Sequence, residues 1–341
     1  MTLFPFKPRE RFSARIQIVL QEGKKVLLNA VHASLELYKI MIPLLVLTRI
    51  LEQTGVIVLL GNLLEPLMSI VGLPGRMGLV WATSLVVGTY GALLVFVTLL
   101  ASTPLTVAQA TILLTMCLIA HSLPIETMIA RRAGLRIGFQ ILLRMGASIF
   151  YGWILHHIYR AGTFLQTPAR VLVPVSMPDS SLWGWIEGQF QNLLSLFLII
   201  LGVMALLRLL EAFGIVALLN KVLSPVLRLM GIGERAIPIT MVGFLLGLSY
   251  GGGLIIQEMK SSNIPPREMF FSLAFMSILH SIIEDTVTMV VFGAHLSGLF
   301  WGRLAFTFLV IWVLVKLTHP LSDVAFDRYF FTPVRQIFKE S

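Results

Sequence analysis

The sequence predicts an all-α polytopic membrane protein made of two inverted repeats, each with three crossings, an apolar or interfacial helix and a glycine-broken re-entrant hairpin. Three observations lead to this fold class. The 341 residues are 57% hydrophobic and only 13% charged, with a mean hydropathy of +0.88, far from the composition of soluble proteins. Long apolar runs recur, whereas a β-barrel would show short alternating segments. The sequence also matches itself after a shift of 159 residues.

The self-match involves residue types that chance rarely aligns. The coinciding pairs include Arg49 with Arg208, Pro66 with Pro225, Gly88 with Gly247, His121 with His280, Arg144 with Arg303, and Trp153 with Trp312. Matches of leucine would mean little in so apolar a chain. Charged, proline, histidine and tryptophan matches in one register indicate two copies of one structural unit.

Each copy contains the same five elements in the same order. A first span is predicted at 31–51 and 190–210, because crossing the hydrocarbon takes about 20 helical residues. A modest apolar helix with an internal proline follows at 56–71 and 215–230. A glycine-broken segment is next, at 77–103 and 236–262. A fourth segment, 106–131 and 264–291, is interrupted at "AHSLPIET" and "LHSIIEDT", and a last span closes each copy at 135–158 and 298–318.

The glycine-broken segments predict re-entrant hairpins. They contain "GTYGALL" in the first copy and "GLSYGGGLIIQE" in the second, although glycine is about 1 kcal/mol worse than alanine inside a helix. Their length suits two half-length helices that enter the membrane and return on the same side, since two crossings would need about 40 residues. Three crossings then remain per copy, and an odd number inverts the second copy relative to the first.

The distribution of basic residues agrees with this inversion. With the N-terminus inside, the scheme puts most of the 26 Lys and Arg residues in the cytoplasm, as the positive-inside rule requires. Full-length hairpins would give the same parity, so the rule supports inversion without establishing re-entrance. We expect a multi-pass protein of the bacterial inner (cytoplasmic) membrane with both termini cytoplasmic. The net charge of +9 then reflects topology, and no nucleic-acid partner is expected.

The copies set the expected domains. Residues 1–39 form an N-terminal amphipathic cytoplasmic helix, 40–160 the first repeat, 161–182 an external linker with three prolines, 183–318 the second repeat, and 319–341 a cytoplasmic tail. Apolar residues recur at helical spacing among Arg and Lys over 9–38, which is typical of a helix on the membrane surface. A solvated leader fits that pattern equally well. The polar, basic tail from Ser322 is assigned no element.

Polar side chains gather at the predicted breaks. A free backbone group survives at membrane depth only where protein or a water-filled cavity satisfies it, and ionisable residues there are costly and usually functional. We therefore predict one substrate-binding site from both copies. Its residues are Gly88, Thr89, Tyr90, Gly91, His121, Ser122, Glu126 and Thr127 from the first copy, and Gly247, Ser249, Tyr250, Gly251, Gly252, Gly253, Glu258, His280, Ser281, Glu284, Asp285 and Thr286 from the second.

The carboxylates Glu126, Glu284 and Asp285 are the candidates for charge or proton coupling. Arg144 and Arg303 are candidate counter-charges or structural clamps. In a purely structural alternative, the carboxylates pair with these arginines and the histidines brace the broken helices.

The two histidines, His121 and His280, are candidates for hydrogen bonding or metal binding. His280 and Glu284 are four residues apart, which would place them on one helix face and makes a metal ion conceivable. In the first copy His121 and Glu126 are five apart with Pro124 between them, which argues against a metal. The identity of any metal stays unknown at this stage.

Enzyme activity and cofactors are not expected. The chain has no G-x-x-x-x-G-K-[ST] loop and no HExxH. Two classes of function remain: a transport-type membrane protein that moves a small polar solute or cation through a midplane site, or a non-transporting scaffold or partner subunit. Homo-oligomer formation is left open.

The glycine-rich hairpins "GTYGALL" and "GLSYGGGLI", each followed by a helix broken at "AHSLPIET" or "LHSIIEDT", resemble the nucleoside-recognition or Gate domain family. The chain is similar to a tandem pair of Gate domains over about 40–318. The resemblance extends to the membrane domain of ferrous-iron transporters and to the core of concentrative nucleoside transporters. It implies that hairpin tips and broken helices hold a nucleoside or cation. By position, the implied site is Gly88–Gly91, His121–Thr127, Gly247–Gly253 and His280–Thr286. The chain departs from the iron transporters in having no GTP-binding domain, and it is shorter than the nucleoside transporters.

Overall fold

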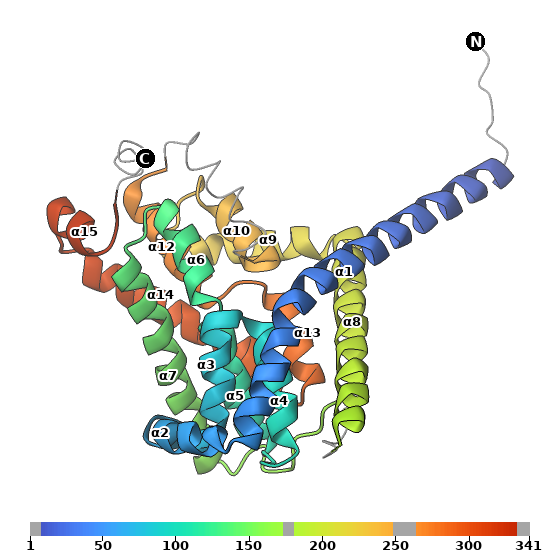
Figure 1. Cartoon of the computed structure of the whole chain (residues 1–341). Coiled ribbons are helices and arrows are strands. Elements are labelled where there is room, and N and C mark those ends of the chain that lie inside the picture. Colours follow the sequence, from blue (N-terminus) through green and yellow to red (C-terminus); the bar gives the residue numbers. More distant parts are fainter. Residues whose placement is uncertain (1–7, 173–180, 248–263, 333–341) are drawn as a thin grey trace.

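The computed structural model describes residues 8–172, 181–247 and 264–332. Every regular element within these ranges is a helix, as predicted. Figure 1 shows a bundle of upright helices from which the N-terminal part of α1 (Pro8–Gln53) projects. α1 is one continuous helix, so the expected amphipathic helix and the expected first span are not separated by a break in secondary structure.

The first half follows the predicted order of elements. After α1 come α2 (Val56–Ile70), the short 3-10 helix η1 (Gly75–Met77), α3 (Gly78–Val87), α4 (Thr89–Leu100), α5 (Val107–Ile119), α6 (Leu123–Arg132) and α7 (Ile137–Ala161). α2 contains Pro66, as predicted. Gly88 separates α3 from α4, and residues 120–122 separate α5 from α6, so both predicted interruptions of this half are present.

The second half repeats this order. It contains α8 (Leu182–Ala212), α9 (Ile215–Leu229), α10 (Ile237–Leu246), α12 (Pro266–Ile278), α13 (Ile282–Val291), the π-helix η2 (Ser297–Gly302) and α14 (Arg303–Thr318). α9 contains Pro225. α10 ends at Gly247 as α3 ends at Gly88. The predicted return arm after it lies in 248–263, outside the described residues.

Within the described residues, five helical segments are long and apolar enough to cross a membrane, and a bent pair could add a sixth. The five are Val107–Arg132, Ile137–Ala161, Leu182–Leu210, Pro266–Val291 and Ser297–Thr318. The bent pair joins 58–70 to 75–87 at 97°. The expected first span of the first copy, 31–51, lies within α1 but is not among these segments.

The chain turns back at Gly88. α3 and α4 pack against each other, and α4 also contacts η1, which precedes α3. A hairpin is therefore present at the glycine break of the first half.

Equivalent helices of the two halves pack against each other and run antiparallel. The Tyr38 hydroxyl on α1 donates to the carbonyl of Leu193 on α8, and further along α1 the guanidinium of Arg49 lies over the ring of Trp185, nearer the start of α8. α7 and η2–α14 are related in the same way, because Tyr159 contacts Ser297 whereas Phe150 contacts Phe306. Two apolar cores, one around α5 and one around α12, each also include residues of the other half.

The tail contains a helix that the sequence analysis did not assign. α15 (Asp323–Tyr329) begins at Ser322, whose hydroxyl accepts from the Ala325 N–H. Phe326 and Phe331 are buried against residues from both halves. The expectation of an unstructured tail was wrong for these residues, because aromatic burial and a helix cap outweigh the polar composition.

The first part of the linker between the halves packs against helix ends. Val107 and Ala108, at the start of α5, donate backbone hydrogen bonds to Thr167 and Leu165, and Leu172 donates to Val291 at the end of α13. The linker residues 162–172 therefore lie across the ends of helices from both halves. Residues 173–180 are outside the described residues.

Candidate functional site

Within each half, the glycine break lies against the break of the following helix pair. Ser122 and Ser281, between the paired helices α5–α6 and α12–α13, share the left-handed backbone conformation (φ 46°, ψ 38°). Gly88 and Gly247 have φ of 112° and 87°. A Cβ added at Gly88 would lie 2.6 Å from the Ser122 hydroxyl, and one at Gly247 would lie 2.3 Å from that of Ser281. The glycines therefore allow the hairpin turn to approach the broken helix closely, in the same way in both halves.

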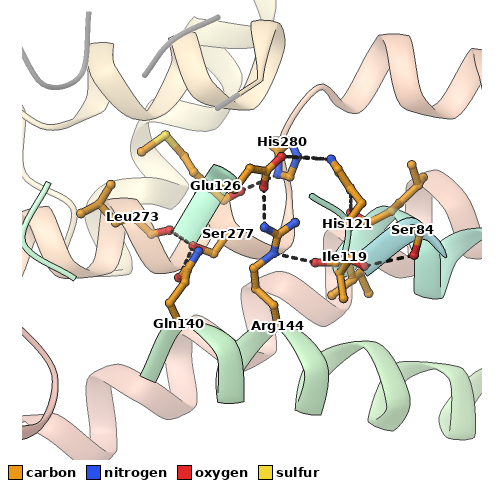
Figure 2. Close-up of polar contacts among 12 residues, drawn as sticks. Ser84, Ile119, His121, Glu126, Gln140, Arg144, Leu273, Ser277 and His280 are labelled. Atoms are coloured by element: carbon orange, nitrogen blue, oxygen red, sulfur yellow. Dashed lines mark hydrogen bonds and ion pairs between the residues drawn. The ribbon is translucent and has the colours of Figure 1, made fainter. Parts of the chain in front are cut away.

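The histidines of the two breaks meet in a buried cluster. His121 Nε2 and His280 Nε2 are 3.1 Å apart. Glu126 Oε1 lies 3.1 Å from His121 Nε2 and 3.5 Å from His280 Nε2. Arg144 Nη1 donates to the other oxygen of Glu126, and Arg144 Nε donates to the carbonyl of Ile119 at the end of α5 (3.0 Å; Figure 2). All four side chains are buried, and Arg144 is 0% exposed. We call these residues the histidine cluster.

Backbone carbonyls fix the orientation of both rings. His121 Nδ1 lies 3.0 Å from the carbonyl of Leu118, and His280 Nδ1 lies 2.8 Å from that of Met276. The unsatisfied carbonyls at the C-terminal end of a helix are natural partners for such groups. The ends of α5 and α12 thus position the histidines, and each Nε2 faces the other half.

A second polar cluster lies on α13 and its neighbours. The Tyr90 hydroxyl on α4 donates to Glu284 Oε1 (3.0 Å), so this contact also joins the two halves. Asp285 Oδ2 lies 3.6 Å from Arg303 Nη1. This pair is the counterpart of Glu126 and Arg144, but its two charged atoms are farther apart.

The helix before the arginine also differs between the halves. η2 directly precedes Arg303, whereas the equivalent stretch 138–143 of α7 is regular α-helix. A π-helix adds a residue to the turn and occurs frequently at functional sites. All three guanidinium nitrogens of Arg303 are buried, and none has a hydrogen-bond partner among residues 8–172, 181–247 and 264–332.

Other buried polar atoms also have no hydrogen-bond partner within the part of the chain that the structure describes. They include the hydroxyls of Thr127, Thr286 and Thr288, and Asp285 Oδ2. Such groups are rare and call for an explanation by water, an ion or function. Those of Thr127 and Thr286 occupy equivalent positions in the two halves.

The structure joins many of the predicted residues but changes one pairing. His121, Glu126 and His280 form one cluster, and Tyr90 and Glu284 meet in the other. Arg144 and Arg303 face carboxylates, as the clamp interpretation predicted. Ser249, Tyr250, Gly251, Gly252, Gly253 and Glu258 lie outside the described residues.

The predicted pairing of His280 with Glu284 on one helix face was wrong. The left-handed Ser281 separates them, so His280 faces His121 and Glu126, whereas Glu284 faces Tyr90. The five-residue spacing with Pro124, which argued against a metal, does not keep His121 and Glu126 apart. The break at Ser122 brings these two side chains together.

Sequence reasoning missed Gln140 and Ser277 beside the histidine cluster. The Ser277 hydroxyl contacts Gln140 Oε1 (2.9 Å), linking α12 to α7 (Figure 2). A glutamine inside the apolar span of α7 was the available signal. A cleft of about 450 Å³ between α9 and α10, beside Lys221 and Arg228, is lined by none of the predicted site residues.

Comparison with known proteins finds a Gate match in the first half of the chain. Residues 34–136 match the Gate family model, described as nucleoside recognition. The chain is similar to the uncharacterized membrane protein YvoD of Bacillus subtilis (strain 168), with 25% identity over 277 residues covering 79% of this chain and 88% of YvoD. No solved structure matches. The chain is thus a multi-pass membrane protein that has a bacterial homologue and whose residues 34–136 are similar to the Gate model.

Proposed function

We propose that the protein is a transporter that moves a small polar solute or cation through a site between two inverted repeats. The observation that carries the proposal is the contact between His121 and His280, which come from equivalent breaks in the two halves. Discontinuous helices that meet between inverted repeats near the bilayer midplane are the architecture of secondary transporters. The Gate match to the first half is consistent with this class.

The antiparallel packing of equivalent helices supports the inversion. A two-fold axis in the membrane plane reverses every helix that it relates, and α1 with α8 and α7 with α14 run in opposite directions. An axis along the membrane normal would leave equivalent helices parallel. Within this scheme the hairpin at Gly88 is re-entrant, both termini are cytoplasmic and the protein lies in the bacterial inner membrane.

The polar atoms around the site support a binding role. Arg303 and the threonines at 127, 286 and 288 offer buried groups that have no hydrogen-bond partner among the described residues. A polar solute, a nucleoside or a cation with its water could satisfy them during passage. The chain carries no enzyme role in this proposal, and no cofactor.

Uptake into proteoliposomes tests the proposal. The purified protein is reconstituted and offered labelled nucleosides and divalent metal ions in separate experiments, with and without a proton gradient. We expect saturable uptake of at least one probe. The double variant Glu284→Gln with Asp285→Asn should abolish it, because these carboxylates supply the negative charge beside Tyr90 and Arg303.

The control is Glu234→Gln, a carboxylate that is 76% exposed and remote from both clusters; it should transport as the unmodified protein does. Thermal unfolding of each purified variant checks that it is folded. If the folded protein moves none of the probes and thermal-shift screening finds no ligand, the transporter proposal fails and the scaffold alternative is favoured.

A further inference from the structure

The histidine cluster has the geometry of a metal site. His121 Nε2, His280 Nε2 and Glu126 Oε1 form a triangle with sides of 3.1, 3.1 and 3.5 Å. A triangle of this size has a point about 2 Å from all three corners, the length of bonds from zinc to histidine nitrogen and carboxylate oxygen. We propose that His121, His280 and Glu126 bind one divalent transition metal ion.

The histidine rings present the correct atoms. A carbonyl oxygen can only accept a hydrogen bond, so Nδ1 of each ring carries the proton toward Leu118 or Met276. Nε2 of the neutral ring then carries no proton and has a free lone pair. Two such lone pairs 3.1 Å apart, next to a carboxylate oxygen, repel one another unless a cation lies among them. Metal-bound histidines commonly donate their other ring N–H to a backbone carbonyl.

Arg144 orients the carboxylate. It holds Glu126 Oε2, and its Nε is fixed by the carbonyl of Ile119. Only Oε1 is therefore directed at the histidines, which makes Glu126 a single-oxygen ligand. Hydrogen bonds of this kind to a ligating carboxylate are usual around metal sites. Arg144 is a positioning residue in this arrangement.

The ligand set and its charge surroundings favour transition metals. Two histidines and one carboxylate with open coordination positions are typical of Zn²⁺ and Fe²⁺ sites, whereas Mg²⁺ and Ca²⁺ prefer oxygen ligands. Among the described residues of the two clusters, the carboxylates Glu126, Glu284 and Asp285 outnumber the guanidinium groups of Arg144 and Arg303. The excess negative charge offsets part of the charge of a bound cation.

Open positions suit an ion that must be released. Three protein ligands leave room for water to enter and exchange, and the ligands come from both halves of the chain. Movement of the halves would therefore separate His280 from His121 and Glu126 and weaken binding. That the ion is cargo rests on the proposed transport function, whereas the binding site does not.

Cobalt binding tests the site. The full chain, purified in detergent with a tag that contains no histidine, is titrated with Co²⁺ and its visible absorption is recorded. We expect one equivalent of Co²⁺ to give bands typical of nitrogen and oxygen ligands, and Zn²⁺ to displace it. His121→Gln and His280→Gln should each weaken binding at least about tenfold, in line with losses seen even for residues around metal ligands. The control His157→Gln removes an exposed histidine on α7 and should leave binding unchanged.

X-ray absorption of the Co²⁺-loaded unmodified protein gives a second measurement that does not depend on whether the variants fold. Scattering from two imidazoles supports the site. If the bands are absent, or if they persist in both histidine variants, the proposed metal site is overturned. The close approach of the two histidines is then explained by a proton shared between them. Uptake of ⁶⁵Zn²⁺ by proteoliposomes separates the two proposals. Binding without uptake of any probe keeps the site and rejects transport, whereas nucleoside uptake without Co²⁺ binding rejects the site and keeps transport.

Discussion

Gly88 and Gly247 hold backbone conformations that other residues rarely adopt. Gly88 has φ 112° and ψ −177°, and Gly247 has φ 87° and ψ 162°, a region occupied almost solely by glycine. Each also lies against a serine of the neighbouring break. Gly88→Ala should therefore lower the free energy of unfolding by about 1–3 kcal/mol from backbone strain, and by more where the Ser122 hydroxyl clashes. Thermal or denaturant unfolding in detergent measures this.

Gly146→Ala is the matched control. Gly146 lies within α7, and an added Cβ would meet nothing within 4 Å. Alanine is about 1 kcal/mol better than glycine in a helix, so this variant should be at least as stable as the unmodified protein. Adding Ser122→Ala to Gly88→Ala should remove the clash with the hydroxyl and restore that part of the stability, but the loss from backbone strain should remain. Equal stability of Gly88→Ala and Gly146→Ala would contradict the role given to the break.

At the residue scale, the sequence predicted the site's members better than their contacts. The histidines and carboxylates stood out because ionisable groups are costly in an apolar segment. The contact of His121 with His280 joins residues 159 positions apart, and no local pattern encodes it. The pairing of His121 with Glu126 depends on the left-handed backbone conformation of Ser122. Serine rarely adopts this conformation. Spacing rules for a continuous helix failed there for that reason.

Helix α15 ties the two halves together near the C-terminus. Phe326 is buried under the guanidinium of Arg267, and Arg267 donates to the carbonyls of Thr318 and Leu321. Arg136, at the start of α7, donates to the carbonyl of Asp327. Phe326→Ala should lower the free energy of unfolding by about 3–5 kcal/mol, because it leaves a cavity in this core. Denaturant unfolding in detergent checks the value.

The control for α15 is Val324→Ala. Val324 is 81% exposed on the same helix, and substitutions at such positions usually change stability by less than about 0.5 kcal/mol. A similar loss in both variants would mean that α15 does not dock through Phe326.

At the element scale, helices with their own apolar pattern were predictable, whereas those that depend on remote partners were not. α2 and α9 were found within a residue or two, because each is an apolar run with a glycine immediately before it. α15 is short and polar, and its stability depends on the α6–α7 loop far away in the sequence. The π-helix before Arg303 was also missed, since the sequence there reads as an ordinary span.

At the scale of the whole molecule, the internal repeat determines what the fold can be. It fixed the order of helices in both halves, and the structure has the interruptions at equivalent places. The orientation of one half relative to the other could not be predicted from the repeat in the same way. It depends on how the two copies pack and not on their shared sequence. Antiparallel contacts between α1 and α8 favour inversion, but they do not assign either end to a side of the membrane.

Chemical labelling at equivalent positions tests the inversion directly. Thr54 follows α1 and Phe213 follows α8; both are exposed, at turns where Gly55 and Gly214 share a left-handed conformation. In a Cys117→Ala background, Thr54→Cys and Phe213→Cys are made separately and treated with a membrane-impermeant maleimide. With cytoplasmic termini, right-side-out vesicles should label only the Thr54 site and inside-out vesicles only the Phe213 site. Inversion must place equivalent turns on opposite faces, because three crossings separate each from its counterpart. Labelling of both sites from one face would mean that the copies are parallel, and a transport scheme built on inverted halves would have to be abandoned.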